Sequence, residues 1–331
     1  MRRLNVGNPT LFDNMRDHAS LHEFDDIEKL LDWKKLEKHL APIYSSSEGG
    51  ASYPPIMMFR AILLQVWHNL SDVQTEKLLN RDLLFRRFCR LSLVDNAPDH
   101  STISRFRSQL QKADLYQRLL DEVNEQLADK GAIVRVGEIS ILDASVIEAH
   151  QCRKKPGVNR ENTQDKEAGW AVKTGTKGTK ESTFGFKVHA NVDEDGFLKK
   201  LKTTAGNVHD SQVLEDILTG SEEEAYGDGA YAGKPIEKIL EERNIKNKIN
   251  RRAYRNKPLT KDDEEHNSTM SGVRYVVERT FGAIKRHYGA GKTRFLGIQK
   301  TQGWLTVIAI AHNLKKAAAI LRPCPLRDQC A

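Results

Sequence analysis

The sequence contains little cysteine, and its cysteines are too far apart to form a framework. The four are Cys89, Cys152, Cys324 and Cys330, and no two of them make a Cys-x-x-Cys pair. Structural zinc sites and disulfide-rich folds need cysteines at short, regular spacings. We therefore expect free thiols in a reducing cytosol, and a disulfide or metal site shared by Cys324 and Cys330 is the less favoured alternative.

Long apolar runs are also scarce. Charged residues make up 29% of the chain, and we expect them to interrupt any run before it reaches the roughly 18 residues that a membrane helix needs. The basic start, Met1 to Asn5, is followed by no apolar stretch, which argues against a secretory signal. The sequence therefore predicts a cytoplasmic protein without a membrane partner.

Acidic residues are absent from two long segments. From Arg279 to Arg327 there are ten lysines or arginines and no acid, and from Arg243 to Lys257 there are seven more and no acid. A solvated helix face normally mixes both signs of charge. The two basic segments lie on either side of Glu278, within a chain of net charge +7. This arrangement favours a nucleic-acid backbone running past a lone acid.

The first 130 residues have the apolar periodicity of helices. Ser71 has the position of a helix cap, and Asp99 to Thr102 forms a second capping segment. The expected helices span residues 26–39, 56–69, 72–79, 81–89, 101–110 and 116–128.

Beyond Gly131 strands alternate with helices, which is typical of an α/β domain. A β-branched segment, 134–142, predicts a strand that closes at Asp143, and the polar segment 151–180 predicts a loop. The other expected strands are 184–192, 197–204, 224–226 and 245–249, and the expected helices are 210–218, 234–242, 273–287 and 304–321. We predict a helical domain over 1–130, a catalytic domain over 131–322 and a tail over 323–331.

Three acids fall where a metal site would need them. Asp143 closes the first predicted strand, Asp228 follows the strand 224–226, and Glu278 lies on the helix 273–287. Phosphoryl transfer between nucleic-acid strands uses two divalent cations roughly 3.5–4 Å apart, and Mg²⁺ prefers clustered carboxylates. Taken singly, the three acids fit a strand-end cap, a turn residue and a surface acid paired with Arg274. Taken together, they predict a catalytic triad.

The helix that carries Glu278 also carries two cations on the same face. Arg274 precedes Glu278 by four residues and Lys285 follows it by seven, so at about 3.6 residues per turn all three project to one side. This spacing resembles the signature of bacterial insertion-sequence transposases with an RNase-H-like DDE core: Tyr, two residues, Arg, three residues, Glu, six residues, Lys. Ser271 stands at the tyrosine position, and Tyr275 lies one residue past the arginine.

Other segments, covering roughly residues 50–320, extend the resemblance in the same order. Leu142 to Ser145 resembles the family's first-Asp strand, and Gly227 to Tyr231 resembles its second-Asp segment. Ala205 to Ser211 is similar to a Gly-Asn-x-His-Asp-Ser stretch, and Phe85 to Phe88 with Pro98 to Arg107 resembles the helical front domain of the "insertion sequence five" branch. Only 49 residues separate Asp228 from Glu278, too few for the large β insertion that some relatives carry there.

The resemblance implies an RNase-H-like catalytic core behind an all-helical DNA-binding domain. It implies an enzyme of the bacterial cytoplasm, associated with the nucleoid, that cuts DNA at terminal inverted repeats and joins the 3′-hydroxyl ends to target DNA. Asp143, Asp228 and Glu278 would bind two Mg²⁺ ions, for which Mn²⁺ would substitute. The partners would be double-stranded DNA and, on that DNA, a second copy of the chain.

Further residues are predicted to contact DNA. Arg274 and Lys285 would steady phosphates, His209 with Asp210 would orient DNA or the first metal ligand, and Lys187 would look into the site from the strand that also carries His189. A recognition helix, Ser101 to Leu110, would present Arg105 and Arg107. Arg251 and Arg252 belong to the basic segment before Glu278. The alternatives are a loop histidine at 209 that hydrogen-bonds locally, and a simple helix cap with a surface arginine at 105.

Three other functions remain open from the residues. A DNA nuclease that cuts without joining would use the same acids, and a DNA-binding descendant of a transposase would not need the intact triad. A small-molecule metal hydrolase would be expected to have histidine-rich ligands rather than flanking basic segments.

Overall fold

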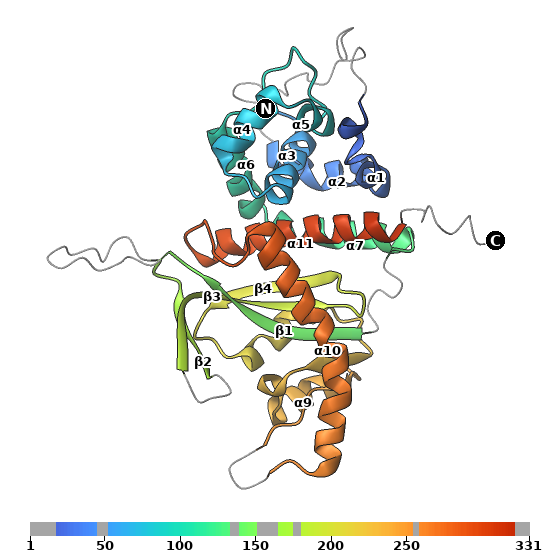
Figure 1. Cartoon of the computed structure of the whole chain (residues 1–331), viewed down its shortest axis with the longest axis vertical. Coiled ribbons are helices and arrows are strands. Elements are labelled where there is room, and N and C mark those ends of the chain that lie inside the picture. Colours follow the sequence, from blue (N-terminus) through green and yellow to red (C-terminus); the bar gives the residue numbers. More distant parts are fainter. Residues whose placement is uncertain are drawn as a thin grey trace, which may run out of the picture. The chain divides into compact units, whose positions relative to one another are not determined.

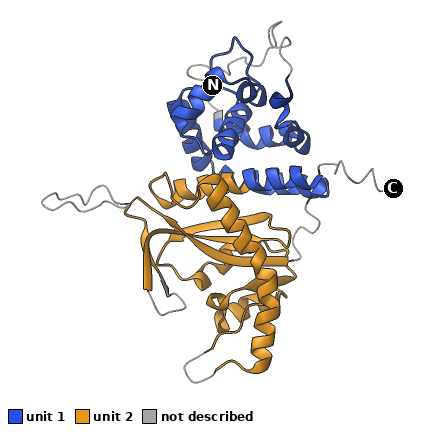
Figure 2. Cartoon of the chain, in the orientation of Figure 1, with its two compact units in different colours: residues 1–134, 310–331 blue, residues 135–309 orange. Residues whose placement is uncertain are grey.

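The structure, a computed structural model, describes residues 18–44, 52–132, 139–150, 165–174, 180–253 and 258–321. It divides the chain into two compact units, coloured separately in Figure 2. The first comprises Met1–Val134 with Ile310–Ala331, and the second comprises Arg135–Ala309. The division near 134 lies close to the predicted boundary at 130, whereas residues from Ile310 onward group with the N-terminal helices rather than with the predicted domain 131–322.

Helices make up the described part of the first unit (Figure 1). They are η2 Ala19–His22, α1 Asp25–Leu30, α2 Trp33–Leu40, η3 Ala41–Tyr44, α3 Pro55–Trp67, α4 Asp72–Arg81, α5 Leu83–Phe88, α6 His100–Lys112, α7 Leu115–Asp129 and the end of α11 Ile298–Leu321. Helix α4 begins with a reciprocal capping box between Ser71 and Gln74, as the sequence predicts. The single predicted helix 26–39 is wrong: Asp32 is extended and caps α2, so the chain forms two helices there.

The centre of this unit is α3, where residues from Pro55 to Trp67 are nearly all buried. The C-terminal half of α11 completes this core. The Trp67 indole donates a hydrogen bond to the Ala311 carbonyl at 3.0 Å, and the Asn313 side chain donates to the Asn124 side chain at 2.8 Å. Residues from the two ends of the chain therefore build one hydrophobic unit.

Helix α11 contradicts the expectation that charged residues interrupt every apolar run before it reaches the length of a membrane helix. Its residues, Ile298–Leu321, are apolar and long enough to cross a membrane, so charged residues do not interrupt every apolar run. In the structure 61% of its most apolar window is buried. Core helices of folded proteins commonly have this composition, because both their faces pack against protein.

The second unit is built on a six-stranded sheet in the order β2-β3-β1-β5-β6, with β4 also pairing with β3. Its strands are β1 Ile139–Glu148, β2 Gly169–Thr174, β3 Lys180–Val192, β4 Leu198–Ala205, β5 Glu224–Gly227 and β6 Lys246–Asn247. The pairs β1–β3 and β3–β4 are antiparallel, whereas β1–β5 and β5–β6 are parallel. Antiparallel and parallel pairs occur in one sheet that helices cover, so the predicted mixed α/β fold is confirmed.

Helices pack on this sheet. The short helices are η4 Asp210–Gln212, α8 Leu214–Ile217, η5 Gly229–Tyr231 and α9 Lys234–Glu242, and the longest helix is α10 Lys261–Tyr288. A core cluster joins Leu142 and Ala225 of the sheet to Leu214, Tyr231 and Leu240. Neighbouring residues of a strand point to opposite faces, so Asp143 points away from this cluster. In Figure 1, α10 crosses the sheet beside β1.

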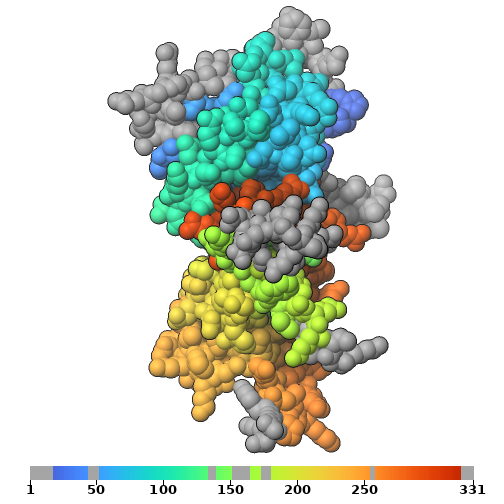
Figure 3. All heavy atoms as spheres, turned by 90° about the vertical axis from the view of Figure 1, so that its left-hand side faces the viewer, coloured from blue at the N-terminus to red at the C-terminus, as the bar shows by residue number. Residues whose placement is uncertain are grey.

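Two strand predictions in this unit are wrong. Asp143 does not close its strand, because β1 continues through five more residues to Glu148 along β3. The segment 151–180 is not loop throughout, because β2 pairs with the outer part of β3. At Gly185, where β3 passes between β1 and β2, a Cβ atom would lie 2.0 Å from the Ile147 carbonyl oxygen. Figure 3 shows the segments of β2 and β3, in lime, next to the chain that follows β4, in yellow.

Helix α10 is almost twice as long as predicted. It begins at Lys261 rather than near Val273, with Thr260 and Asp263 forming a capping box. The added residues, Lys261 to Gly272, are mostly polar, so no apolar stripe predicts that they are helical. The predicted helix 210–218 is instead two short helices, η4 and α8, and the predicted strand 245–249 shrinks to β6. The predicted antiparallel strands 184–192 and 197–204 and helix 234–242 are confirmed by β3, β4 and α9.

Candidate active site

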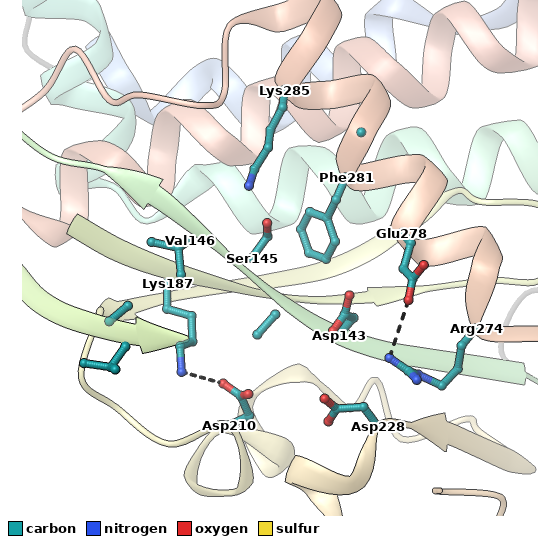
Figure 4. A pocket seen from close by; sticks show the side chains of 14 residues that line it. Asp143, Ser145, Val146, Lys187, Asp210, Asp228, Arg274, Glu278, Phe281 and Lys285 are labelled. Carbon is teal, nitrogen blue, oxygen red and sulfur yellow. Dashed lines mark ion pairs between the residues drawn. The ribbon is translucent and has the colours of Figure 1, made fainter. Parts of the chain in front are cut away.

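The three predicted catalytic acids line one pocket of the second unit (Figure 4). Asp143 comes from β1, Asp228 directly follows β5, and Glu278 comes from α10. The parallel register of β1 and β5 places Leu142 opposite Gly227, so the residues that follow them, Asp143 and Asp228, are neighbours. The pocket is also lined by Lys187, Asp210, Arg274, Phe281 and Lys285.

Burial dominates the electrostatics of Asp143. Burial, with the nearby negative charges of Asp228 and Glu278 adding to it, raises the pKa of this carboxyl group to about 6. A hydrogen bond from the Ala144 amide and the charge of Arg274 act in the opposite direction. Asp143 is therefore a carboxylate whose charge is poorly compensated by protein groups.

Asp228 is fixed by local backbone. It is the cap of η5, and its carboxylate accepts a hydrogen bond from the Ala230 amide at 2.9 Å. A free carboxylate oxygen faces the pocket in Figure 4. The short helix thus holds Asp228 in position beside Asp143 without consuming all of its acceptor capacity.

Glu278 faces the pocket from one turn of α10 beyond Arg274. The two side chains form an ion pair of 3.9 Å, drawn as a dashed line in Figure 4. The Arg274 side chain is only 13% exposed, and its Nε has no hydrogen-bond partner among the described residues. This guanidinium therefore compensates the pocket's negative charge, but with incomplete hydrogen bonding. Lys285, seven residues after Glu278, lines the same pocket as its spacing predicts.

The donor set has the chemistry that a hard divalent cation requires. Asp143, Asp228 and Glu278 supply oxygen ligands from three rigid elements. Within the described ranges no three acidic, histidine or cysteine side chains are already close enough to hold a metal ion. The residues therefore fit a divalent cation by the type of their donor atoms and by lining one pocket, in which Arg274 is paired with Glu278.

A second cluster of acidic and basic side chains borders the pocket, and it consists of residues that the sequence analysis names. Lys187 on β3 pairs with Asp210 on η4, with Nζ and Oδ1 3.0 Å apart. His189, completely buried on the same strand, lies 3.6 Å from the same Asp210 oxygen. Burial lowers the pKa of His189 to about 4, so the ring is neutral near pH 7. The sequence predicts that Lys187 and His189 look into the site and that Asp210 orients DNA or a metal ligand, and in the structure Lys187 and Asp210 line the pocket.

Other predicted DNA contacts have local partners. His209 is exposed, and its ring accepts a hydrogen bond from the Ser211 amide, which matches the local alternative. Arg251 pairs with Asp263 of α10 at 2.6 Å. Arg252 is exposed next to Gly229. None of these three lines the pocket, so their contact with DNA stays a prediction.

The two arginines of the predicted recognition helix differ. Arg105 is exposed on α6, and among the described residues its guanidinium donates to Ser101 and Thr102 of the preceding turn. Arg107 is largely buried, and its guanidinium pairs with Asp72 at 2.5 Å and donates to Gln65 at 2.9 Å. The structure therefore gives Arg107 an internal partner and leaves Arg105 facing outward.

Comparison with known proteins finds two family models along the chain. The transposase DDE domain matches residues 135–314, and the transposase domain (DUF772) matches residues 13–109. The first match covers the whole pocket and more than half of the chain.

Three solved structures are similar over long stretches but at low identity. A pre-cleavage Mos1 transpososome is 10% identical, with 80% of this chain and 97% of that chain covered and a TM-score of 0.19. A Mos1 transposase paired-end complex with the left transposon end is 10% identical (79% and 96% covered, TM-score 0.19), and the Mos1 strand transfer complex is 11% identical (80% and 96% covered, TM-score 0.17). The family of the chain is shown by the match of the transposase DDE domain to residues 135–314.

Proposed function

Because the chain belongs to the family of transposases with a DDE domain, we propose that it cuts DNA at the terminal inverted repeats of an insertion sequence and joins the 3′-hydroxyl ends to target DNA. The single observation that carries the proposal is the convergence of Asp143, Asp228 and Glu278 on one pocket that is also lined by cations. A carboxylate cluster alone would repel DNA, whereas cations beside it attract the phosphate backbone.

The three acids would hold two Mg²⁺ ions, for which Mn²⁺ would substitute. When bound, such ions neutralise charge at the reacting phosphorus and make a water or 3′-hydroxyl nucleophilic at neutral pH. The chain's own contribution is rigidity. Asp143 is fixed by β1 and Asp228 by the cap of η5, so the ligands need little reorganisation.

The pocket's cations would position the DNA strand. Arg274 contributes a planar guanidinium suited to bidentate contact with a phosphate. Arg274 now pairs with Glu278 over 3.9 Å, so arrival of a phosphate would give it a better partner and release Glu278 as a ligand. Lys285 would bind a neighbouring phosphate on the same face of α10.

The helical unit would recognise the inverted repeats through α6, with Arg105 as the outward-facing cation. Arg251 and Arg252 would follow the flanking backbone. Two element ends must be joined to one target, so we propose that two copies of the chain act together on DNA. A bacterial cytoplasm, close to the nucleoid, is the location that this substrate implies.

The test uses purified full-length protein, linear DNA with the ends of its own element, and a target plasmid. With Mg²⁺ we expect nicks that expose 3′-hydroxyls at the ends, followed by joined products, and neither without the metal. Asp143→Asn should lose both steps.

Two outcomes would contradict the proposal. Cleavage without joining would identify a nuclease, and binding without cleavage would identify an inactive DNA-binding descendant of a transposase.

A further inference from the structure

Lys187 is held at the wall of the pocket by two groups outside the catalytic triad. Its ammonium donates a hydrogen bond to the Val208 carbonyl at 2.9 Å and lies 3.0 Å from Asp210 Oδ1. The side chain is 18% exposed and lines the pocket. An ammonium has three donors, so Lys187 keeps donor capacity for a phosphate oxygen while its position is restrained.

The surroundings of Asp210 explain why it faces Lys187. His189 lies behind it, with Nδ1 3.6 Å from Asp210 Oδ1 and Nε2 3.0 Å from the Thr204 hydroxyl. Because His189 is neutral near pH 7, Lys187 is the cation that compensates the negative charge of Asp210. Asp210 Oδ1 is itself buried and, among the described residues, has no neighbour in hydrogen-bond geometry.

Tyr231 carries a buried hydroxyl group, which is a hydrogen-bond donor. Its side chain is completely buried, and its hydroxyl has no hydrogen-bond partner within the described ranges. Helix η5, which ends at Tyr231, packs against η4, which begins at Asp210. Burial raises the pKa of this hydroxyl well above its usual value, and Asp210 is the charged group that adds most to the effect, ahead of Asp143 and Asp228. A buried hydroxyl without a hydrogen-bond partner among the described residues therefore lies on the helix that packs against the one carrying Asp210.

We propose that Asp210 is a positioning residue of strand transfer: backed by the Tyr231 hydroxyl, it fixes the Lys187 ammonium where it meets a phosphate oxygen of the bound DNA strand. Asp210 acts through Lys187 and does not itself touch the reacting atoms. The inference rests on the proposed function and adds a named residue pair to it.

This role predicts opposite effects on binding and rate. Asp210→Asn removes a negative charge from a pocket that must admit phosphates, so DNA should bind more tightly. The same change releases Lys187 from its anchor, and a displaced group in an active site costs up to roughly a hundredfold in rate. A residue that only supported the fold would not separate the two quantities in this way.

The experiment measures single-turnover strand transfer over a range of DNA concentrations. For Asp210→Asn we expect the half-saturating DNA concentration to fall about threefold and the maximal rate to fall at least about tenfold. Lys187→Met should lower the rate and weaken binding, and the double variant should be no slower than Lys187→Met alone, because both changes remove one interaction. Additive losses would overturn the proposal.

Asp216→Asn is the matched control. Asp216 pairs with Lys202 at 3.3 Å on the same unit, with both side chains about half exposed and outside the pocket lining. We expect its transfer kinetics to equal those of the wild type. If the wild type joins no ends at all, the proposed function fails, whereas an active wild type with an unaffected Asp210→Asn overturns only this inference.

Tyr231→Phe keeps the experiment decisive if Asp210→Asn does not fold. Removing a buried hydroxyl that lacks a partner should leave the stability of the DNA-free protein unchanged or increased, while the transfer rate falls about tenfold. Tyr226→Phe is the comparison, because its hydroxyl already bonds to Glu224 at 2.8 Å. A destabilised Tyr231→Phe with a normal transfer rate would show that this side chain serves only the core.

Discussion

The two units of this chain differ in how completely their buried arginine side chains are paired. In the helical unit Arg60 pairs with Glu28 at 2.6 Å, donates to the Phe88 carbonyl at 2.8 Å, and stacks on Trp33 with its guanidinium carbon 3.8 Å from the ring centre. In the catalytic unit Arg274 has one ion pair of 3.9 Å and a buried Nε without a partner among the described residues.

The difference in internal partners distinguishes an arginine that stabilises the fold from an arginine that is available to bind a substrate. A buried guanidinium with a complete set of partners gains little from a new ligand, because it must first give up the old ones. A buried guanidinium with incomplete hydrogen bonding gains a strong, charge-assisted contact when a phosphate arrives. The number and quality of internal partners is therefore a better guide to DNA contact than charge or sequence position.

The largest effect is expected where the catalytic unit loses an acid. Glu278→Gln should reduce strand transfer by roughly a thousandfold or more, because a metal ligand is lost. The DNA-free protein should be as stable as the wild type or more so, because one of several mutually repelling carboxylates is gone. Transfer assays and urea unfolding of the same preparation measure both; a variant that still joins strands at the normal rate contradicts the role of Glu278.

The opposite pattern is expected in the helical unit. Arg60→Met should lower the free energy of unfolding by about 3 kcal/mol, since it leaves Glu28 without its best partner and removes the stacking on Trp33. The transfer rate per folded molecule should not change. If urea unfolding shows no loss of stability for Arg60→Met, the idea that Arg60 stabilises the helical unit is contradicted.

The free energy of unfolding should depend on pH because of the buried His189 in the catalytic unit. The pKa of His189 is about 4 in the folded protein, below its usual 6.5, so the unfolded chain binds more protons between these values. The contribution to stability is complete above pH 6.5 and is lost as the pH falls toward 4, by about 3 kcal/mol in total. Urea unfolding at pH 7 and at pH 4.5 should show this loss, and His189→Gln should remove the part that depends on this side chain.

The smallest effects should distinguish the two arginines of α6. Arg107→Gln should cost about 2 kcal/mol of stability, because Asp72 and Gln65 lose their partner. Arg105→Gln should change stability by less than about 0.5 kcal/mol. In DNA-binding measurements at several salt concentrations, however, Arg105→Gln should reduce the salt dependence by about one ion. Equal salt slopes for the wild type and Arg105→Gln would remove α6 from the DNA interface.

Much of the catalytic core could be predicted from sequence, because its signals are local. Arg274, Glu278 and Lys285 reveal themselves by helical spacing, and Asp228 by the glycines around it. The strands that matter most for position, β1, β3 and β5, carry dense β-branched or apolar residues. The order in which they pair was available only through resemblance to a family, since periodicity does not specify neighbours.

What could not be predicted depends on partners distant in sequence. The sequence of its own helix does not reveal the partner of Arg107, because Asp72 lies 35 residues earlier. Strand β2 is a short apolar stretch inside a segment rich in Gly, Lys and Thr, and only its pairing with the edge of β3 identifies it as a strand. Asp210 was visible in a motif, but its proposed role depends on Lys187 and Tyr231, which come from two other elements.

The division of α11 between the two units has a consequence for the order of synthesis. Residues 135–309 leave the ribosome before Ala311 and Asn313, which complete the helical core against Trp67 and Asn124. The N-terminal helices are thus made first but are among the last to reach their final packing. During translation they must remain without their closing helix while almost two hundred further residues are added, and a premature stop before Ile310 would damage the beginning of the protein as much as its end.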